Sequence, residues 1–392
     1  MNERELRRAL RRLGGHPDPV ARERAWRVVR AAHAEQAPER RPRRWARLAT
    51  LAALLAVLAG GTAAAAATTR GGIGRVVHDV LGIGAPHAHA ALVHVPGGGR
   101  LLVQDGGTTW VVSGAGTRRR LGSYDGASWS PRGLFAVAWR GGTLTAVTPS
   151  GTLRWSLSRP APIDVARWSP GDGFRIAYLS GGALRIVNGD GSGDRRYDAA
   201  AGVTPAWRPG ADHVLAYVDA RRRVQVAAVD ARRRLWRSGP LADPVALAWS
   251  AGGGRLLVLE RERVVVFDAA GRRVASRALA GAQAAAWSPR APEVAVVRAG
   301  PAAGTSSLVL LDGAHGLRSR VLFSGPGAFG APAWAPGGRA LLLPWPDAGQ
   351  WLFLRTSGSG RPTAVANIAR QFSPGAATPR FPDAVAWCCG QP

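Results

Sequence analysis

The chain has 392 residues, of which 46% are hydrophobic, and it contains 51 glycines and 28 prolines. This length would allow two or three domains, and the hydrophobic fraction suffices for a core, which excludes a wholly unfolded chain. All 52 basic residues are arginines, against 25 acidic residues, and the formal net charge is +27. Because genome composition can also produce an arginine-only bias, the charge by itself does not define a function.

Residues 1–47 are polar and strongly basic, with fourteen arginines against six acidic residues. Two short helices are predicted: Gly14-Gly15 ends the first, and Asp18 caps the second, with Pro19 at its first position. We interpret this tail as a basic arm that lies on anionic lipid headgroups. The alternative is a docking segment for a cytoplasmic partner.

The segment Leu48–Thr69 carries no charge over 22 positions. About 20 apolar residues span a bilayer, so we predict one transmembrane helix here. Five arginines crowd its N-terminal side, and the positive-inside rule then places residues 1–47 in the cytoplasm and the rest of the chain outside. The protein is thus predicted to be a single-pass protein of the cell membrane. The alternative is a signal peptide cleaved within Ala63–Ala67.

Residues 70–99 are predicted to link the membrane to the next domain. A zinc site would need several converging ligands, and no cysteine or carboxylate other than Asp79 lies at a familiar ligand spacing. We therefore predict no metal site in the linker. Its histidines, half of the eight in the chain, are His78, His87, His89 and His94.

A sequence motif centred on tryptophan recurs through the rest of the chain. A short apolar run ends in Trp-Ser-Pro or a variant, and a turn and a second apolar run follow. Successive tryptophans are 39, 39, 42, 38, 47 and 53 positions apart. A period of about 40 residues is typical of one four-stranded propeller blade. We expect each tryptophan to pack between blades and not to bind a ligand. They are Trp129, Trp168, Trp207, Trp249, Trp287, Trp334 and Trp387.

The repeat that begins at Asp164 illustrates the four strands of a blade. Its runs at 164–168, 174–179, 184–187 and 194–197 are separated by turns rich in Pro, Gly, Asn and Asp. Short Val, Ile and Leu runs bounded by such residues are typical of buried strands. The same pattern predicts the third strand of later repeats at 224–229, 264–267, 308–311 and 352–354.

Both ends of the repeat region are incomplete. Trp387 ends one strand and leaves no room for three more, whereas three strands at 100–103, 108–112 and 118–121 precede the first repeat tryptophan, Trp129. We predict that these four strands form one blade. The fold class is then all-β, a seven-bladed β-propeller over residues 100–392 that is closed by strands from both ends, which leaves no open sheet edge.

The repeat resembles that of TolB-like propellers, a WD-repeat-like family whose signature is an apolar strand, Trp-Ser-Pro-Asp-Gly, a second strand and a later Asp-Gly hairpin. The resemblance covers roughly residues 90–392, and the segments 129–131, 168–170 and 287–289 match best. The Asp-Gly after proline is mostly absent. The resemblance implies a propeller of bacterial type outside the cytoplasm, and it implies no single activity.

No motif for catalysis or cofactor binding stands out, and we expect neither an enzyme nor a cofactor. There is no nucleophile elbow and no zinc-protease histidine motif. Gly325–Gly330 matches a glycine pattern of dinucleotide sites but precedes a strand and contains proline. Asn188–Asp194 resembles a calcium loop without its final glutamate, and a hairpin turn explains it better. The alternative is a lyase or hydrolase with its site in the central channel, for which His213, Asp243 and Asp347 are candidates without a pattern.

Cys388 and Cys389 are the only cysteines and are adjacent. Outside the cytoplasm they would either form a vicinal disulfide or remain thiols, because ordinary strand geometry does not allow a conventional disulfide between neighbours. We interpret them as two small residues of the closing blade.

The arginines predict a binding surface. In a propeller, the turn between the first and second strands and the turn between the third and fourth strands share one face. Arginines gather in or beside these turns, so we predict a basic rim on that face. The predicted rim residues are Arg118, Arg119, Arg120, Arg132, Arg195, Arg196, Arg232, Arg233, Arg234, Arg272, Arg273, Arg290 and Arg339.

A basic rim attracts an anionic envelope polymer or an acidic protein. Nucleic acid is not expected as a partner, because exposed aromatic residues are sparse. Tail, span and repeat together predict a membrane-anchored propeller outside the cytoplasm that acts as a binding or scaffold module. Besides the channel enzyme, the alternative is an anti-sigma-like membrane sensor, although the usual zinc-binding His and Cys set is missing.

Overall fold

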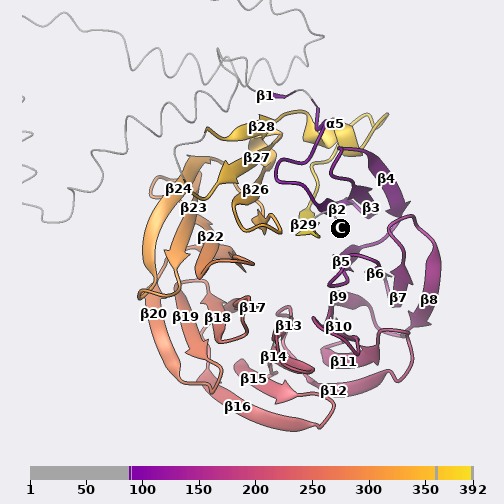
Figure 1. Cartoon of the computed structure of the whole chain (residues 1–392), viewed down its shortest axis with the longest axis vertical. Helices are drawn as coiled ribbons and strands as arrows, with labels where there is room; N and C mark the ends of the chain where they lie inside the picture. The colour runs from indigo at the N-terminus through magenta and orange to yellow at the C-terminus, as the bar shows by residue number, and fades with distance from the viewer. Residues whose placement is uncertain (1–87, 90, 358–360, 390–392) are drawn as a thin grey trace, which may run out of the picture. The chain divides into compact units, whose positions relative to one another are not determined.

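The computed structural model describes residues 88–89, 91–357 and 361–389 (Figure 1). The predicted tail (1–47), the predicted membrane span (48–69) and most of the predicted linker lie outside these residues. Within the described residues, no helix is long and apolar enough to cross a membrane. The chain divides into two units between Thr69 and Arg70, and all described residues belong to the second unit.

The described residues form seven sheets arranged in a ring, which confirms the seven-bladed β-propeller (Figure 1). We number the blades in the order of their tryptophans along the chain. Blade 1 has β5 (Gly126–Trp129), β6 (Ala136–Arg140), β7 (Thr143–Val147) and β8 (Leu153–Ser158). Blade 2 has β9 (Ile163–Trp168), β10 (Arg175–Ser180), β11 (Ala183–Asn188) and β12 (Arg195–Ala199). Blade 3 has β13 (Ala206–Trp207), β14 (Val214–Val218), β15 (Arg223–Ala228) and β16 (Arg233–Pro240).

The remaining blades follow the same plan. Blade 4 has β17 (Pro244–Trp249), β18 (Arg255–Glu260), β19 (Arg263–Asp268) and β20 (Arg273–Ala278). Blade 5 has β21 (Ala282–Trp287), β22 (Glu293–Ala299), β23 (Thr305–Asp312) and β24 (Arg318–Pro326). Blade 6 has β25 (Ala333–Trp334), β26 (Ala340–Trp345), β27 (Gln350–Arg355), β28 (Thr363–Val365) and an added strand β1 (Ala88–His89). Blade 7 has β29 (Ala384–Cys388), β2 (Arg100–Asp105), β3 (Thr108–Val112) and β4 (Arg118–Gly122).

Within a blade, the strand that carries the tryptophan lies innermost and the fourth strand lies on the circumference (Figure 1). The middle strands are rich in Val, Leu and Ile and form the core; all five residues of β14 are buried. The outer strands β8 and β20 are mostly exposed. Burial thus follows the apolar runs of the sequence, and the predicted third strands correspond to β15, β19, β23 and β27.

The ring closes as predicted. β29 pairs antiparallel with β2, and Trp387 lies opposite Leu101 in the register. The indole N–H of Trp387 donates a hydrogen bond to the carbonyl of Gly98 at 2.7 Å, and its ring packs edge-on against Phe353 of blade 6 at 5.7 Å. The last strand of the chain is therefore tied both to the first sheet and to the neighbouring blade.

The repeat tryptophans join consecutive blades. The indole N–H of Trp207 donates to the carbonyl of Arg167, the residue before Trp168, at 2.9 Å. Trp249 and Trp287 repeat this bond to Ala206 (3.2 Å) and Ala248 (2.9 Å), each again the residue before the preceding tryptophan. The bond from Trp334 to Ala286, 2.9 Å, continues the series. The expected packing between blades is thus confirmed for these four residues.

Three elements were not predicted. β1 lies within the predicted linker and pairs parallel with β28, so that blade 6 has five strands. The short helix α5 (Ile368–Phe372) buries Ile368 and Phe372 in the core that β2 and β27 share. A single 3₁₀ turn, η1 (Pro346–Ala348), connects β26 to β27. Both α5 and η1 lie outside the repeat pattern, which explains the long spacing from Trp334 to Trp387.

Of the two states left open for the cysteines, the structure has the vicinal disulfide between Cys388 and Cys389. It lies against Gly133, in the turn between β5 and β6 of blade 1. A Cβ built on Gly133, which has φ of +62°, would approach the sulfurs too closely. Glycine is therefore required where blade 7 meets blade 1.

Candidate anion-binding groove

The central channel offers little chemistry. Of all the residues in the seven innermost strands, Asp164 and Arg167 are the only ones with charged side chains. Burial lowers the pKa of Arg167, whose guanidinium donates to the carbonyl of Ala166 at 3.1 Å. Within the described residues, no three His, Cys, Asp or Glu side chains are placed to hold a metal ion.

The three candidate channel residues are not brought together. Nδ1 of His213 shares a hydrogen bond with Asp230 at 2.6 Å, beside the hairpin between β15 and β16. Asp243 pairs with Arg261 at 2.8 Å. Asp347 accepts the backbone N–H of Ala328 at 2.7 Å, in the segment that matched a glycine pattern. Asn188–Asp194 forms the hairpin between β11 and β12, as expected.

The predicted rim arginines lie on several elements. Some begin outer strands, namely Arg118, Arg119 and Arg120 in β4, Arg195 and Arg196 in β12, Arg233 and Arg234 in β16, and Arg273 in β20. The others, Arg132, Arg232, Arg272, Arg290 and Arg339, lie in turns. Acidic neighbours pair with three of the set: Asp172 with Arg132, Asp230 with Arg195, and Asp268 with Arg272. That the rim binds a partner stays a prediction.

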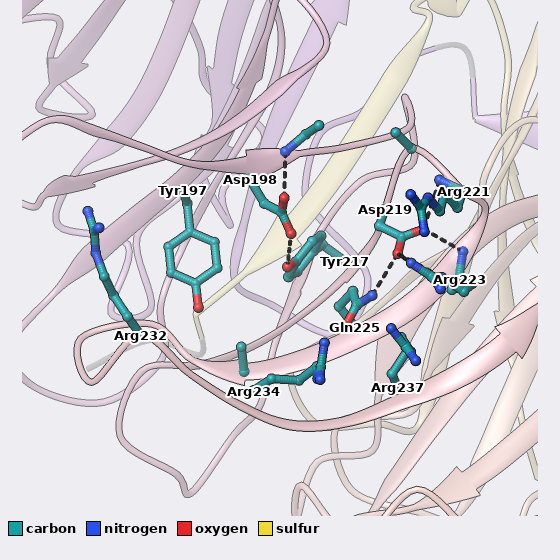
Figure 2. A pocket seen from close by; sticks show the side chains of 13 residues that line it. Tyr197, Asp198, Tyr217, Asp219, Arg221, Arg223, Gln225, Arg232, Arg234 and Arg237 are labelled. Atoms are coloured by element: carbon teal, nitrogen blue, oxygen red, sulfur yellow. Dashed lines mark hydrogen bonds and ion pairs between the residues drawn. The ribbon is translucent and has the colours of Figure 1, made fainter.

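Arg232 and Arg234 open onto a groove between blades 2 and 3, with a volume of about 460 Å³ (Figure 2). β12 of blade 2 forms one wall, and β14, β15 and β16 of blade 3 form the floor and the other wall. The charged and polar residues of the groove are Tyr197, Asp198, Tyr217, Asp219, Arg221, Arg223, Gln225, Arg232, Arg234 and Arg237.

Asp219 organises one end of the groove. It follows β14 at a tight turn, and its Oδ1 accepts the backbone N–H groups of Arg221 and Arg223, both at 2.9 Å. Its Oδ2 accepts from Gln225 at 2.6 Å and from the guanidinium of Arg223 at 3.0 Å (Figure 2). Burial alone would raise the pKa of the Asp219 carboxyl, but these four hydrogen bonds together hold it below the ordinary value.

Two tyrosines line the middle of the groove. The hydroxyl of Tyr217 donates to Oδ2 of Asp198 at 2.5 Å, and Oδ1 of Asp198 accepts the backbone N–H of Ala199 (Figure 2). The rings of Tyr197 and Tyr217 meet edge to face at 6.1 Å. Burial, and for Tyr217 also the bond to Asp198, raises the pKa of both hydroxyls. Both tyrosines therefore stay neutral at physiological pH.

The groove has an excess of positive charge. Five arginines line it against two aspartates, and both aspartates already accept hydrogen bonds from the protein. Arg223 pairs with Asp219 at 2.9 Å. Among the described residues, no side-chain hydrogen bond or ion pair satisfies the guanidinium groups of Arg221, Arg232, Arg234 or Arg237. Since a guanidinium fork matches carboxylate and phosphate oxygens, these groups can receive an anionic ligand.

Asp219→Asn is expected to lower the free energy of unfolding at pH 7 by about 1–3 kcal/mol, because the carboxylate accepts four hydrogen bonds and Asp219 is only 6% exposed. A carboxyl whose pKa is lower in the folded state stabilises the protein above its unfolded pKa, about 3.9, and this contribution disappears as pH falls through the folded value. The difference between the two proteins should therefore shrink below about pH 4. Chemical denaturation from pH 7 to 3 checks this, and a constant difference would contradict it.

A second cavity, of about 560 Å³, lies between blades 5 and 6. It contains the predicted residues Arg290 and Arg339 together with Arg320, which pairs with Glu293 at 3.3 Å. Arg320 also donates to the backbone carbonyl of Thr356. This cavity holds three arginines and one carboxylate, so it is less basic than the groove between blades 2 and 3.

Several groove residues were not predicted as site residues, namely Tyr197, Asp198, Tyr217, Asp219, Arg221, Arg223, Gln225 and Arg237. They come from four strands on two blades and from the turn between β14 and β15. Sequence spacing does not show which side of a blade a residue faces. One signal was present: Tyr178 and Tyr217 are as far apart in the sequence as Trp168 and Trp207 are. Aligning the repeats on the tryptophans would have placed both tyrosines at equivalent positions between blades.

Comparison with known proteins supports the fold alone. No protein-family model and no curated protein matches the chain. Three solved structures are similar at TM-scores of 0.52–0.53. A chain of a mitotic checkpoint complex is 17% identical, over 69% of this chain and 90% of that one. The β-propeller domain of Cps50 (Swd1) from Myceliophteria thermophila is 15% identical, over 69% and 98%. KlHsv2 with loop 6CD replaced by a Gly-Ser linker is 13% identical, over 68% and 92%.

These neighbours place the chain among seven-bladed propellers of WD40-like architecture. Because the fold hosts many functions, the function of this chain has to be argued from its own site.

Proposed function

We propose that the protein is a binding or scaffold module that engages an acidic protein or an anionic polymer through the groove between blades 2 and 3. The observation that carries the proposal is the set of groove arginines: four of the five have no ion pair among the described residues. Cations that converge in a concave site raise the local concentration of anions and favour their binding.

We also propose that the protein acts without catalysis. The innermost strands carry Asp164 and Arg167 as their only charged residues, and the three channel candidates are engaged in separate local interactions. A channel lyase or hydrolase would need an acid and a base that converge on one substrate. This composition favours binding over chemistry.

For the cellular location, we propose the arrangement suggested by the sequence. A helix over Leu48–Thr69 anchors the protein in the cell membrane, residues 1–47 lie in the cytoplasm, and a TolB-like propeller of bacterial type lies outside. Protease added to spheroplasts should then digest the propeller and spare an epitope tag placed before Met1. Protection of the propeller would contradict this arrangement.

The binding proposal is tested with the full-length protein in detergent micelles and two charge-matched triple variants. Arg221, Arg234 and Arg237 are changed to glutamine in the first variant. The control changes three exposed arginines outside the predicted rim, Arg140 in β6, Arg318 in β24 and Arg370 in α5, which have no side-chain bond within the described residues. Binding to immobilised polyglutamate and polyphosphate is compared with binding to neutral dextran over a range of salt concentrations.

We expect retention on the anionic supports that falls with salt, because exposed ion pairs are screened. Both triple variants lose the same formal charge, so a general charge effect would weaken both equally. The proposal predicts a clearly larger loss for the groove variant. Equal retention of the protein on anionic and neutral supports would refute the anion-binding function. Equal losses of retention in the two triple variants would show that the groove is not the binding site.

A further inference from the structure

We infer that the groove between blades 2 and 3 is a phosphate site that takes an extended ligand with successive phosphate groups, such as a polyphosphate or a polyol-phosphate chain. The inference rests on the proposed function and commits it to one ligand chemistry. It comes from a comparison of this groove with the preceding interface of the same ring.

Between blades 1 and 2, an internal carboxylate neutralises the arginines. The side chain of Asp194 is only 5% exposed and pairs with Arg185 at 2.5 Å and with Arg159. The hydroxyl of Tyr178 donates to the same carboxylate at 2.5 Å. This interface therefore supplies its own anion.

Between blades 2 and 3, the equivalent tyrosine is Tyr217, and the strand pairing is repeated. Tyr178 lies opposite Arg185 in β10 and β11, and Tyr217 lies opposite Gln225 in β14 and β15. The number of residues between Arg185 and Gln225 equals the number between Asp194 and Arg234. When the two repeats are aligned, Arg234 is therefore the counterpart of Asp194. A cation thus occupies the position at which the preceding interface has its carboxylate.

The interface between blades 2 and 3 thus has arginines without an acidic partner where the preceding interface has an internal ion pair. Asp198 and Asp219 do not compensate, because Asp198 accepts from Tyr217 and Ala199, and Asp219 accepts from its own turn and from Gln225. The four open arginines are exposed, so water solvates them when no ligand is bound. An anion that enters the groove would accept from them the charge-assisted hydrogen bonds that Asp194 accepts in the preceding interface.

The length of the groove favours more than one anionic group. Arg232 and Arg234 lie at the end of β15 that meets the hairpin to β16, and Arg221 and Arg223 lie at the other end (Figure 2). The six residues of β15 separate the two pairs by roughly 17 Å. A single phosphate cannot reach both ends, whereas a chain of phosphates can.

Phosphate fits this groove better than carboxylate does. A phosphate group offers more acceptor oxygens than a carboxylate and can accept from several guanidinium forks at once. A single-stranded nucleic acid would also need aromatic faces for its bases, but Tyr197 is half-buried and meets Tyr217 edge to face. The favoured ligand is therefore a phosphate chain without bases.

The test measures binding of the full-length protein in micelles to fluorescently labelled linear polyphosphate. Unlabelled orthophosphate, polyglutamate, single-stranded DNA and phosphatidylcholine vesicles with phosphatidylglycerol serve as competitors. The decisive variant is Arg234→Asp, which places a carboxylate where the preceding interface has Asp194. The control is Arg318→Asp, an equal charge change at an exposed position of β24 that lies outside the predicted rim and has no side-chain partner in the described part of the chain.

We expect Arg234→Asp to weaken polyphosphate binding by about 10–100-fold, as the loss of one or two charge-assisted hydrogen bonds implies, and Arg318→Asp to weaken it by less than about 3-fold. Polyphosphate should compete far better than orthophosphate. The vesicle competitor decides between a soluble polymer and a lipid headgroup as the source of phosphate. Unchanged thermal unfolding of Arg234→Asp shows that the variant folds, and Arg234→Gln replaces it if the variant does not.

The outcomes separate this inference from the proposed function. If polyglutamate competes as well as polyphosphate and Arg234→Asp weakens both, the phosphate chemistry is refuted and the anion-binding module stands. If single-stranded DNA competes best, the ligand class is likewise refuted. If Arg234→Asp and Arg318→Asp have equal effects, the groove is not the site. If no anionic polymer binds, both the inference and the proposed function fail.

Discussion

A chain that ends at Asp383, and so lacks β29, is expected to lose its closed ring. The truncation removes five residue pairs between β29 and β2, including Leu101 with Trp387. It also removes the bond from Trp387 to Gly98 and the contact of its ring with Phe353. Ladder hydrogen bonds contribute about 1 kcal/mol each and an indole several more, so we expect a loss of at least about 5 kcal/mol, comparable to the whole stability of many domains.

The truncation also exposes a sheet edge. β2 is buried at five of its six positions, and without β29 its backbone groups would face solvent and pair with other chains. Size-exclusion chromatography should show higher-order species, and thermal unfolding should lose its cooperativity. The matched control ends at Cys389 and keeps all of β29. A truncated protein that stays monomeric and melts like the control would contradict the closure described for blade 7.

Trp287→Ala is the second change with a large expected effect, a loss of about 3–5 kcal/mol in the free energy of unfolding. The ring is buried, with 8% of its surface exposed, and packs in the core shared by blades 4 and 5. Its N–H bond to Ala248 crosses from blade 5 to blade 4. The substitution therefore leaves a cavity and an unsatisfied carbonyl at the same interface.

Trp287→Phe separates the two effects. It keeps an aromatic ring in the core and removes the N–H donor together with the five-membered ring, so about 1–2 kcal/mol should be lost. Urea denaturation followed by circular dichroism measures all three proteins. If alanine and phenylalanine cost the same, the bond between blades, and not the ring packing, dominates the contribution of this tryptophan.

The sequence predicted much of this fold because blades repeat locally. Each tryptophan marks an inner strand, and a spacing of about 40 residues leaves room for three more strands. The closure could be predicted since Trp387 has no following strands and the strands within residues 100–121 follow no tryptophan of the repeat. β1 could not be predicted in this way, because a two-residue parallel pair with β28 has no hydrophobic period of its own. The helix α5 is likewise too short for one.

The site was harder to predict than the fold. Arg232 and Arg234 were expected on a basic rim, and the structure places them with Arg221, Arg223 and Arg237 along the side of the ring. Clusters of arginine are visible in a sequence, but their neutralisation is not. Asp230, for example, holds both Arg175 and Arg195 across the interface between blades 2 and 3. The structure is needed to show which arginines have an acidic partner and which, like Arg234, have none among the described residues.

The position of β1 has a mechanical consequence. Tension on the segment that precedes Ala88 reaches the ring at its circumference, where the described contacts of the strand are the pairs Ala88–Ala364 and His89–Val365 and the bond from the N–H of Ala366 to the carbonyl of His89. These contacts should rupture first, and the load then passes to the buried side chains of Leu92 and Val95. The pairing between β2 and β29 would bear the load only after these two sets of contacts have broken. Under a pulling force the propeller would therefore yield in steps and extend at its entry before the ring itself opened.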